Sequence, residues 1–367
     1  MRSRVSGQAR LSHLEFLAHR LSSNDSTTWR NLMQDDMVHR TSKQEGSGNR
    51  RTIVKAGVFR LIQIAWLPIV FVRYVPFVLK LILFSRTSGA SSTALVSSLY
   101  TRWMLHKLGT RLDEPAVRLM MVLPNISHLG GGTLLAYRLT GYMPRIYRYP
   151  YEGDPPMAHE PAARTTFFDA ALTRHLGDIS QLVLLGAGYD TRSYRMPEEI
   201  HCFEIDREKT QQTKRQMLNK ASLDTRRITF VPADFLKEDW LEELVHAGFD
   251  PNKPSFFLWE GVTMYLDREA VISTLRKIAG VARGSVVAFD YFHADLIEAR
   301  SLFMRYARAL TNASGEPFRF GIETTKPSSK HVAAFLASCG LSMEEQRNFG
   351  QETDLKPAMA GFTTAIV

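Results

Sequence analysis

The chain has 367 residues, of which 44% are hydrophobic and 23% are charged. This balance is typical of a globular protein, and it excludes a wholly disordered chain and a collagen-like repeat. Two cysteines, Cys202 and Cys339, are too few for a disulfide framework or a structural zinc site, and they favour a reducing compartment. The length suits one large domain or two ordinary ones.

The net charge of +9 comes entirely from the N-terminal quarter of the chain. Residues 1–90 hold 14 basic and 5 acidic side chains, whereas residues 91–367 hold 32 of each. An enzyme that acts on nucleic acid usually carries its basic stripe on the working domain. The neutral C-terminal part therefore argues against nucleic acid as a partner.

Residues 1–55 form a polar, basic tail in which Arg10–Leu21 places leucines at helical spacing. An Arg-rich amphipathic start is typical of a mitochondrial presequence, although Glu15 weakens that interpretation. We therefore favour a mobile tail over a targeting signal. Ser22–Arg51 is rich in Ser, Asn, Thr and Gln and is predicted to be a linker.

Residues 56–88 are a hydrophobic segment, and the apolar run Val58–Phe84 is long enough to cross a bilayer. Arg73 falls in mid-span, where it would cost about 2.5–3.5 kcal/mol on the insertion scale. Pro68 and Pro76 would break a helix in water and are better tolerated in lipid. We expect contact with a membrane surface, spanning or flat, and the alternative is an arm packed on the body of the protein or on a second subunit.

Residues 89–180 are predicted to form a mostly helical cap. Helices are expected over Ser91–Leu108 and Glu160–His175, with a break at Gly130–Gly132 between them. Tyr142–Pro156 holds four Pro and four Tyr and is predicted to be a loop or a lid.

Strands and helices alternate from residue 181 onward. Short apolar runs typical of buried strands lie at Gln181–Leu185, Ile200–Ile205, Ile228–Val231, Ser255–Trp259 and Ser285–Phe289. Helix-like segments lie at Glu208–Ala221, Trp240–Ala247 and Arg268–Val281. This alternation predicts an α/β fold with a parallel sheet that has helices on both faces. Ser342–Phe349 and Gly361–Val367 are expected to close the sheet as a hairpin, with the second strand at the sheet edge.

The first predicted strand runs into Gly186, Ala187 and Gly188. Glycines here allow a tight turn and let a ligand approach the backbone closely. The dinucleotide fingerprint needs a third glycine, and that position is Thr191. The loop alone is therefore a weak sign of a nucleotide-like cofactor.

Acidic residues stand at the carboxyl ends of the next three strands, as Asp206, Asp234 and Glu260. Ligands of open α/β sheets bind at this edge. Carboxylates suit a ligand with ribose hydroxyls, an amine and a positive centre, and they suit a pyrophosphate less well. This pattern favours S-adenosyl-L-methionine over NAD.

Each acid also has a structural interpretation. Asp206 and Asp234 are placed to cap helices, and Glu204 is an alternative ligand for the ribose. Glu260 follows an apolar strand, where a charge needs a partner. Asp290 is expected to be structural or to face the substrate. The histidines show no metal-ligand spacing, so we predict no metal.

The sequence contains the runs ARTTFFD, QLVLLGAGYDTRSYR, FEID, PADF and LWEGVTMYL. Together these runs resemble the leucine carboxyl methyltransferase family, and most of all its bacterial-type branch of S-adenosylmethionine-dependent methyltransferases. The resemblance covers roughly residues 91–300. It implies a doubly wound, Rossmann-like class I methyltransferase sheet, mostly parallel with a C-terminal antiparallel strand and an N-terminal helical cap. Residues 89–367 would form this methyltransferase domain.

The resemblance also implies roles for the residues that match. Arg164 would bind the methionyl carboxylate of the cofactor. The backbone of Gly186, Ala187 and Gly188 would lie along the methionyl part of the cofactor. Asp206 would hold the ribose hydroxyls.

Asp234 and Phe235 would frame the adenine, with Asp234 accepting from its amine. Glu260 would face the amino acid part or the reacting centre, and it is the candidate catalytic residue. Arg207 after the second-strand acid and Phe235 in place of leucine depart from the family pattern.

The expected reaction is methyl transfer to an oxygen nucleophile, either a carboxylate or a hydroxyl, of a small or lipophilic acceptor. A carboxylate needs no base, whereas a hydroxyl benefits from one, for which Glu260 or a histidine is a candidate. Two other functions are compatible with the sequence. One is a membrane-attached scaffold with a degenerate pocket, and the other is an NAD(P)-dependent oxidoreductase.

Overall fold

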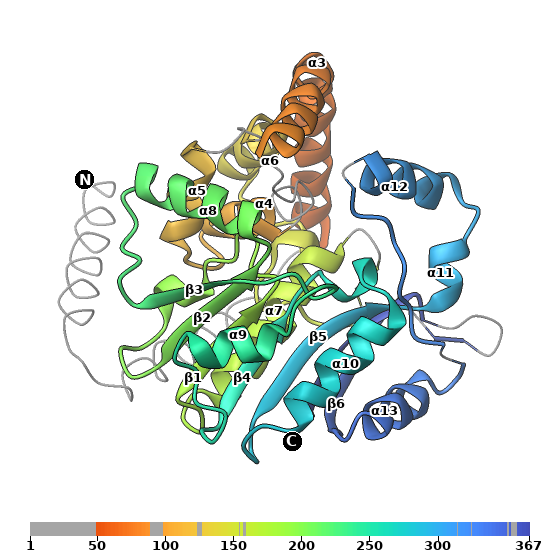
Figure 1. Cartoon of the computed structure of the whole chain (residues 1–367). Coiled ribbons are helices and arrows are strands. Elements are labelled where there is room, and N and C mark those ends of the chain that lie inside the picture. Colours follow the sequence, from red (N-terminus) through yellow and green to blue (C-terminus); the bar gives the residue numbers. More distant parts are fainter. Residues whose placement is uncertain are drawn as a thin grey trace. The chain divides into compact units, whose positions relative to one another are not determined.

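The structure is a computed structural model that describes residues 49–88, 98–122, 127–153, 155–156, 159–313, 315–323, 325–350, 352–353 and 358–367. Residues Asn49–Val367 form one compact unit (Figure 1). The predicted basic tail up to residue 48, with most of the predicted linker, lies outside the described residues.

A seven-stranded sheet forms the centre of this unit, in the order β3-β2-β1-β4-β5-β7-β6. The strands are β1 Gln181–Leu185, β2 His201–Asp206, β3 Ile228–Pro232, β4 Ser255–Trp259, β5 Val286–Phe292, β6 Ser342–Phe349 and β7 Ala360–Ile366. Strands β1 to β5 are parallel, and β7 runs antiparallel to both β5 and β6. The prediction of a doubly wound, mostly parallel Rossmann-like sheet with a C-terminal antiparallel strand is confirmed.

The last strand is not at the sheet edge, contrary to the prediction. Strand β7 lies between β5 and β6, and all but the last of its residues are buried. Strand β6, whose sequence SMEEQRNF is polar, forms the edge instead. The β-branched residues of β7 are better suited to a strand that is paired on both sides than to an exposed edge.

Side chains of β1 alternate between two apolar layers, as the pleat of a buried strand requires. Val183 and Leu185 pack with helices α9 (Trp240–His246), α10 (Arg268–Ala279) and α13 (Ser328–Ser338). Leu182 and Leu184 pack on the opposite face with α7 (Glu160–His175). Figure 1 shows α9 and α10 on the near face of the sheet. Both faces of the sheet are therefore covered by helices, as predicted.

Helices precede and flank the sheet. They are α3 Asn49–Ser88, α4 Tyr100–Lys107, α5 Glu114–Val122, α6 Ser127–Thr140, α8 Glu208–Lys220, α11 Ala294–Glu298 and α12 Leu302–Ala313. The described part of the predicted Ser91–Leu108 helix starts with α4. The predicted loop Tyr142–Pro156 has a short 3-10 turn at Arg145–Tyr147.

Helix α3 is continuous through Pro68 and Pro76, so the two prolines do not end it. One stripe of it packs against the cap. Phe59 and Phe77 are buried, and Gln63 Nε2 donates to Thr133 Oγ1 of α6 at 3.0 Å. The segment is long and apolar enough to cross a membrane, yet only 6% of its apolar window is buried in the protein.

The three glycines expected to interrupt a helix lie inside α6 instead. A Cβ at Gly131 or Gly132 would come within 2.8 Å of the Trp66 side chain of α3. The glycines are needed because the two helices approach closely there, which compensates for their low helix propensity. The prediction treated them as helix breakers because this contact joins residues far apart in sequence.

Candidate functional site

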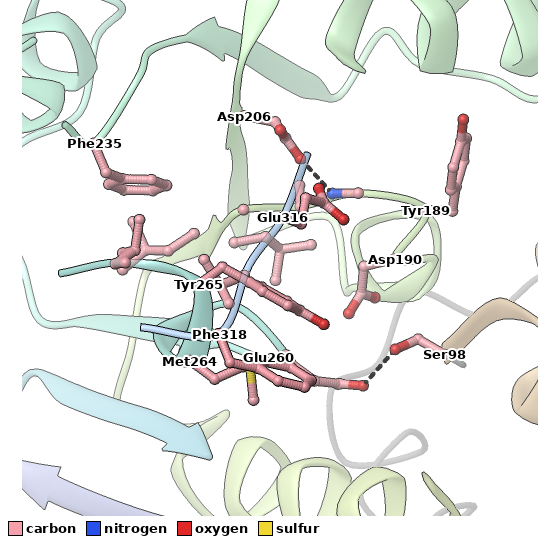
Figure 2. A pocket seen from close by; sticks show the side chains of 18 of the residues that line it. Ser98, Tyr189, Asp190, Asp206, Phe235, Glu260, Met264, Tyr265, Glu316 and Phe318 are labelled. Carbon is pink, nitrogen blue, oxygen red and sulfur yellow. Dashed lines mark hydrogen bonds between the residues drawn. The ribbon is translucent and has the colours of Figure 1, made fainter. Parts of the chain in front are cut away.

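A cavity of about 510 Å³ lies at the carboxyl ends of the parallel strands, beside the point where the strand order reverses between β1 and β4. All the predicted site residues line it, namely Arg164, Gly186, Ala187, Gly188, Asp206, Asp234, Phe235 and Glu260. Figure 2 shows Asp206, Phe235 and Glu260 among its walls. The structure therefore brings the predicted residues together in one place.

The turn after β1 depends on glycine. Gly186 has a φ of +67°, and a Cβ there would lie 2.5 Å from Val262 Cγ2. The chain then enters a short 3-10 helix, Arg192–Arg195, in place of the α-helix that follows the glycines of a dinucleotide site. The described chain therefore does not continue from the glycine turn into an α-helix whose N-terminus could hold a pyrophosphate, and Asp190 forms part of the cavity wall.

Asp206 ends β2 and is held by two backbone amides. Its Oδ2 accepts from Gly188 N at 2.7 Å (Figure 2), and its Oδ1 accepts from Arg207 N at the same distance, 2.7 Å. Burial raises the pKa of Asp206, although both amide donors favour the ionised form. Each oxygen keeps a lone pair, so the carboxylate can accept further hydroxyl donors.

Asp234 and Phe235 follow β3, and both line the cavity. Asp234 Oδ1 accepts from Leu236 N at 3.1 Å, and Lys237 lies 3.3 Å from the other oxygen. The Phe235 ring packs near Trp240 and Trp259, with centroids 6.1 and 6.2 Å away. A flat apolar wall beside a carboxylate suits a planar group that carries an amine.

Glu260 is surrounded by basic groups. Its Oε2 lies 2.6 Å from Arg192 and 3.1 Å from Arg102, and its Oε1 lies 3.4 Å from Arg164. Burial alone would raise the pKa of Glu260, but the three arginines hold this pKa below its ordinary value. The buried charge predicted from the apolar strand thus has its partners, and they make Glu260 a weak proton acceptor.

Arg164 lies in α7 and points between three carboxylates. Its guanidinium lies 3.0 Å from Glu160, 3.1 Å from Asp290 and 3.4 Å from Glu260. Asp290 also accepts from Gly261 N at 2.7 Å and does not line the cavity. Asp290 is therefore structural, one of the two predicted possibilities.

These groups belong to an arginine–carboxylate cluster of largely buried side chains. It comprises Arg102, Arg111, Arg164, Arg192, Arg195, Asp113, Glu160, Asp169, Asp190, Glu260 and Asp290. The carboxylates exceed the guanidinium groups by one. Because the pKa of Glu160 is about 7, the net charge of the cluster is close to zero when Glu160 is protonated and negative when it is ionised. The cluster therefore offers no excess positive charge to a pyrophosphate.

The alternative prediction, that Glu204 binds the ribose, is wrong. Its side chain is fully buried 2.6 Å from Lys214 Nζ and does not line the cavity. Glu204 lies two residues before the end of β2, so the strand holds it within the layer that packs on α8. Only the acid at the strand end reaches the ligand edge.

The structure adds cavity residues that the sequence analysis missed. Arg102 and Ser98 contribute polar groups from the cap, and Tyr189 has a buried hydroxyl with no hydrogen-bond partner among the described residues. Burial raises the pKa of Tyr189. The apolar end holds Met264, Tyr265, Phe292, Met304 and Phe318, with Tyr265 stacked on Phe318 at 5.6 Å (Figure 2). Of these residues, Tyr189, Met264 and Tyr265 lie in motifs that the sequence had singled out. Among the described residues of the predicted lid Tyr142–Pro156, none lines the cavity. No cluster of His, Cys, Asp and Glu among the described residues could hold a metal ion.

Glu160→Gln is expected to become more stable relative to the wild type as the pH rises from about 5 to about 8. Burial raises the pKa of Glu160 from 4.5 to about 7, against the pull of Arg164 and with help from Asp290 and Glu260. Between these values the folded state binds more protons than the unfolded state, so rising pH destabilises the wild type until the loss is complete above pH 7. The full shift corresponds to about 3 kcal/mol, of which roughly 2–3 kcal/mol is lost between pH 5 and pH 8.

Chemical denaturation at both pH values measures this difference. Glu298→Gln, which changes an exposed glutamate on α11, is the matched control and should show no such trend. A constant difference between Glu160→Gln and the wild type across the pH range would contradict the assignment.

Comparison with known proteins shows what part of the chain is similar to them. Residues 148–279 match the family profile described as leucine carboxyl methyltransferase. A Bacillus subtilis protein named as a candidate S-adenosyl-L-methionine-dependent methyltransferase is 35% identical over 167 residues, 43% of this chain and 55% of that protein. A protein of the same description from Mycolicibacterium smegmatis is 36% identical over 165 residues, 43% of this chain and 50% of that protein. The chain matches about half the length of these curated relatives.

Solved structures are similar at lower identity. An O-methyltransferase family protein from Burkholderia thailandensis is 14% identical, with a TM-score of 0.37 over 57% of this chain and 60% of that one. Magnesium protoporphyrin IX methyltransferase from Synechocystis, solved with bound S-adenosylhomocysteine, is 12% identical, with a TM-score of 0.37 over 60% and 90% of the two chains.

Proposed function

We propose that this chain, whose residues 148–279 match the leucine carboxyl methyltransferase family profile, is a member of the bacterial branch of that family. We propose further that it transfers a methyl group from S-adenosyl-L-methionine to an oxygen nucleophile. The observation that supports this most is the carboxylate of Asp206, held at the end of β2 by Gly188 N inside the cavity. A ribose diol offers two donors to such a carboxylate.

The residues of the cavity fit the remaining parts of this cofactor. Asp234 and Phe235 offer an acceptor and an apolar face to adenine. Arg164 offers its guanidinium to the methionyl carboxylate and Glu260 offers its carboxylate to the ammonium group. The sulfonium, ammonium and carboxylate of the cofactor together carry a net charge of +1, which is compatible with a cluster whose carboxylates outnumber its guanidinium groups.

When bound, S-adenosylmethionine supplies a methyl group whose transfer to the acceptor oxygen leaves the C–S electron pair on sulfur. The protein contributes mainly position and charge to such a displacement. A carboxylate acceptor requires no base. For a hydroxyl acceptor, Glu160 is the better proton acceptor, because its pKa of about 7 is close to neutral, whereas three arginines keep Glu260 ionised.

Calorimetric titration of the full chain with S-adenosylmethionine and S-adenosylhomocysteine tests the proposal. Binding with a dissociation constant on the order of micromolar is expected. The full chain is required because Phe77 of α3 is part of the apolar core that includes Trp103 and Tyr189. A folded protein that binds neither compound would favour the scaffold, and a change in NADH fluorescence on mixing would favour the oxidoreductase.

A further inference from the structure

Helix α3 presents an outward surface that is both apolar and basic. Most of the large apolar side chains that are exposed in the described part of the chain lie on it, and Phe71, Val75 and Leu79 are 77%, 56% and 62% exposed. The helix also contains seven Lys or Arg and no Asp or Glu. A soluble surface would be expected to carry mixed charges and fewer large apolar groups.

The packing of α3 indicates how this surface can be used. The buried residues Phe59 and Phe77 are 18 positions apart, so the contacts with the cap extend over about 27 Å of helix. Gly131 and Gly132 of α6 lie against Trp66 between them. Because the cap covers one side of α3 over most of a bilayer's thickness, the helix is better placed to lie along a membrane than to cross it.

Helix α12 connects this surface to the cavity. The hydroxyl of Tyr306 on α12 is 2.8 Å from that of Tyr74 on α3. Met304 and Ala307 of α12 line the cavity, while Leu302 is 81% exposed on the same helix. One wall of the cavity is thus built by a helix that also extends the exposed apolar surface.

We infer that α3 and α12 together form a docking face for a bilayer that contains anionic phospholipid, and that the cavity receives an apolar acceptor from that bilayer. The second part rests on the proposed function. Arg60, Arg73 and Lys80 can extend their charged ends to the headgroups while their stems lie along apolar surface. The apolar end of the cavity, with Phe292, Phe318 and Met304, suits a lipophilic molecule.

Co-sedimentation of the full chain with vesicles tests the docking face. We expect binding to vesicles of phosphatidylcholine with phosphatidylserine, weaker binding to phosphatidylcholine alone, and weaker binding to the anionic vesicles as salt is raised. The double variant F71Q/L79Q should bind the anionic vesicles at least about tenfold more weakly, because it loses two apolar anchors. The control Val245→Gln removes a 41%-exposed apolar side chain on α9 and should bind as the wild type does.

Three results would overturn the inference. They are no binding of the wild type to anionic vesicles, equal binding by F71Q/L79Q, and a wild-type dimer in light scattering that this variant dissociates, which would show that a second copy covers the face. Calorimetric titration of F71Q/L79Q with S-adenosylmethionine separates this inference from the proposed function. If F71Q/L79Q binds the cofactor but not the vesicles, the result supports both the docking face and the proposed function. If the wild type binds the vesicles and neither protein binds the cofactor, the docking face is retained, and the inference that the cavity receives an acceptor from the bilayer is contradicted.

Discussion

Asp206→Ala is expected to weaken the binding of S-adenosylmethionine by about 100-fold or more. A hydrogen bond to a charged group contributes about 1.5–3 kcal/mol, and the carboxylate is placed to accept two from a ribose diol. The substitution also removes the acceptor of Gly188 N, so the turn after β1 is held less firmly. Because Gly186 and Gly188 form the cavity wall, this loosening adds to the loss of affinity.

Calorimetry with the wild type, Asp206→Ala and Asp206→Asn measures this effect. The asparagine variant keeps the size and one oxygen acceptor, so an intermediate loss is expected. Circular dichroism and thermal unfolding show whether each variant is folded. Unchanged affinity in a folded Asp206→Ala protein would remove Asp206 from the cofactor site.

Arg192→Met is expected to lower the free energy of unfolding by about 3–5 kcal/mol. Arg192 is 1% exposed, and its guanidinium lies 2.7 Å from Asp169 and 2.6 Å from both Asp190 and Glu260. Methionine fills a similar volume but leaves these three carboxylates with fewer partners in a buried place. Removing one side of a buried ion pair costs more than the pair itself contributes, because a desolvated charge remains.

Denaturant unfolding of Arg192→Met and of Arg226→Met tests this difference. Arg226 pairs with Asp224 on an exposed surface, so its substitution is expected to have no measurable effect. Equal stability of Arg192→Met and the wild type would mean that the described contacts of Arg192 contribute nothing to the fold.

Much of the sheet and of the ligand edge could be predicted because the signals are local. Three of the seven strands, β1, β4 and β6, have the predicted bounds without change, and helix α7 does as well. Asp206 and Glu260 were found because each follows a short apolar run, and parallel strands must bring such positions to one edge. Local spacing was therefore sufficient to predict the strands and the acidic residues that follow them.

The remaining features depend on contacts between distant parts of the chain. Arg102 and Arg192 join Glu260 from positions 158 and 68 residues away, and no periodicity in the sequence signals such a cluster. Gly131 and Gly132 of α6 are explained by their contact with Trp66, and the place of β7 by its two neighbours. Sequence patterns indicate which side chains prefer burial, but not which partners they find.

The surplus carboxylate of the arginine–carboxylate cluster has a consequence for turnover. Transfer of the methyl group converts a cationic cofactor into a product of almost the same shape with no net charge. When Glu160 is ionised, the cluster carries a net negative charge and attracts the cationic cofactor more strongly than the neutral product, and this preference grows as the pH rises through about 7. The difference in charge would hasten exchange of spent cofactor for fresh and reduce inhibition by the product, and higher ionic strength would weaken this preference only slightly because the cluster is buried.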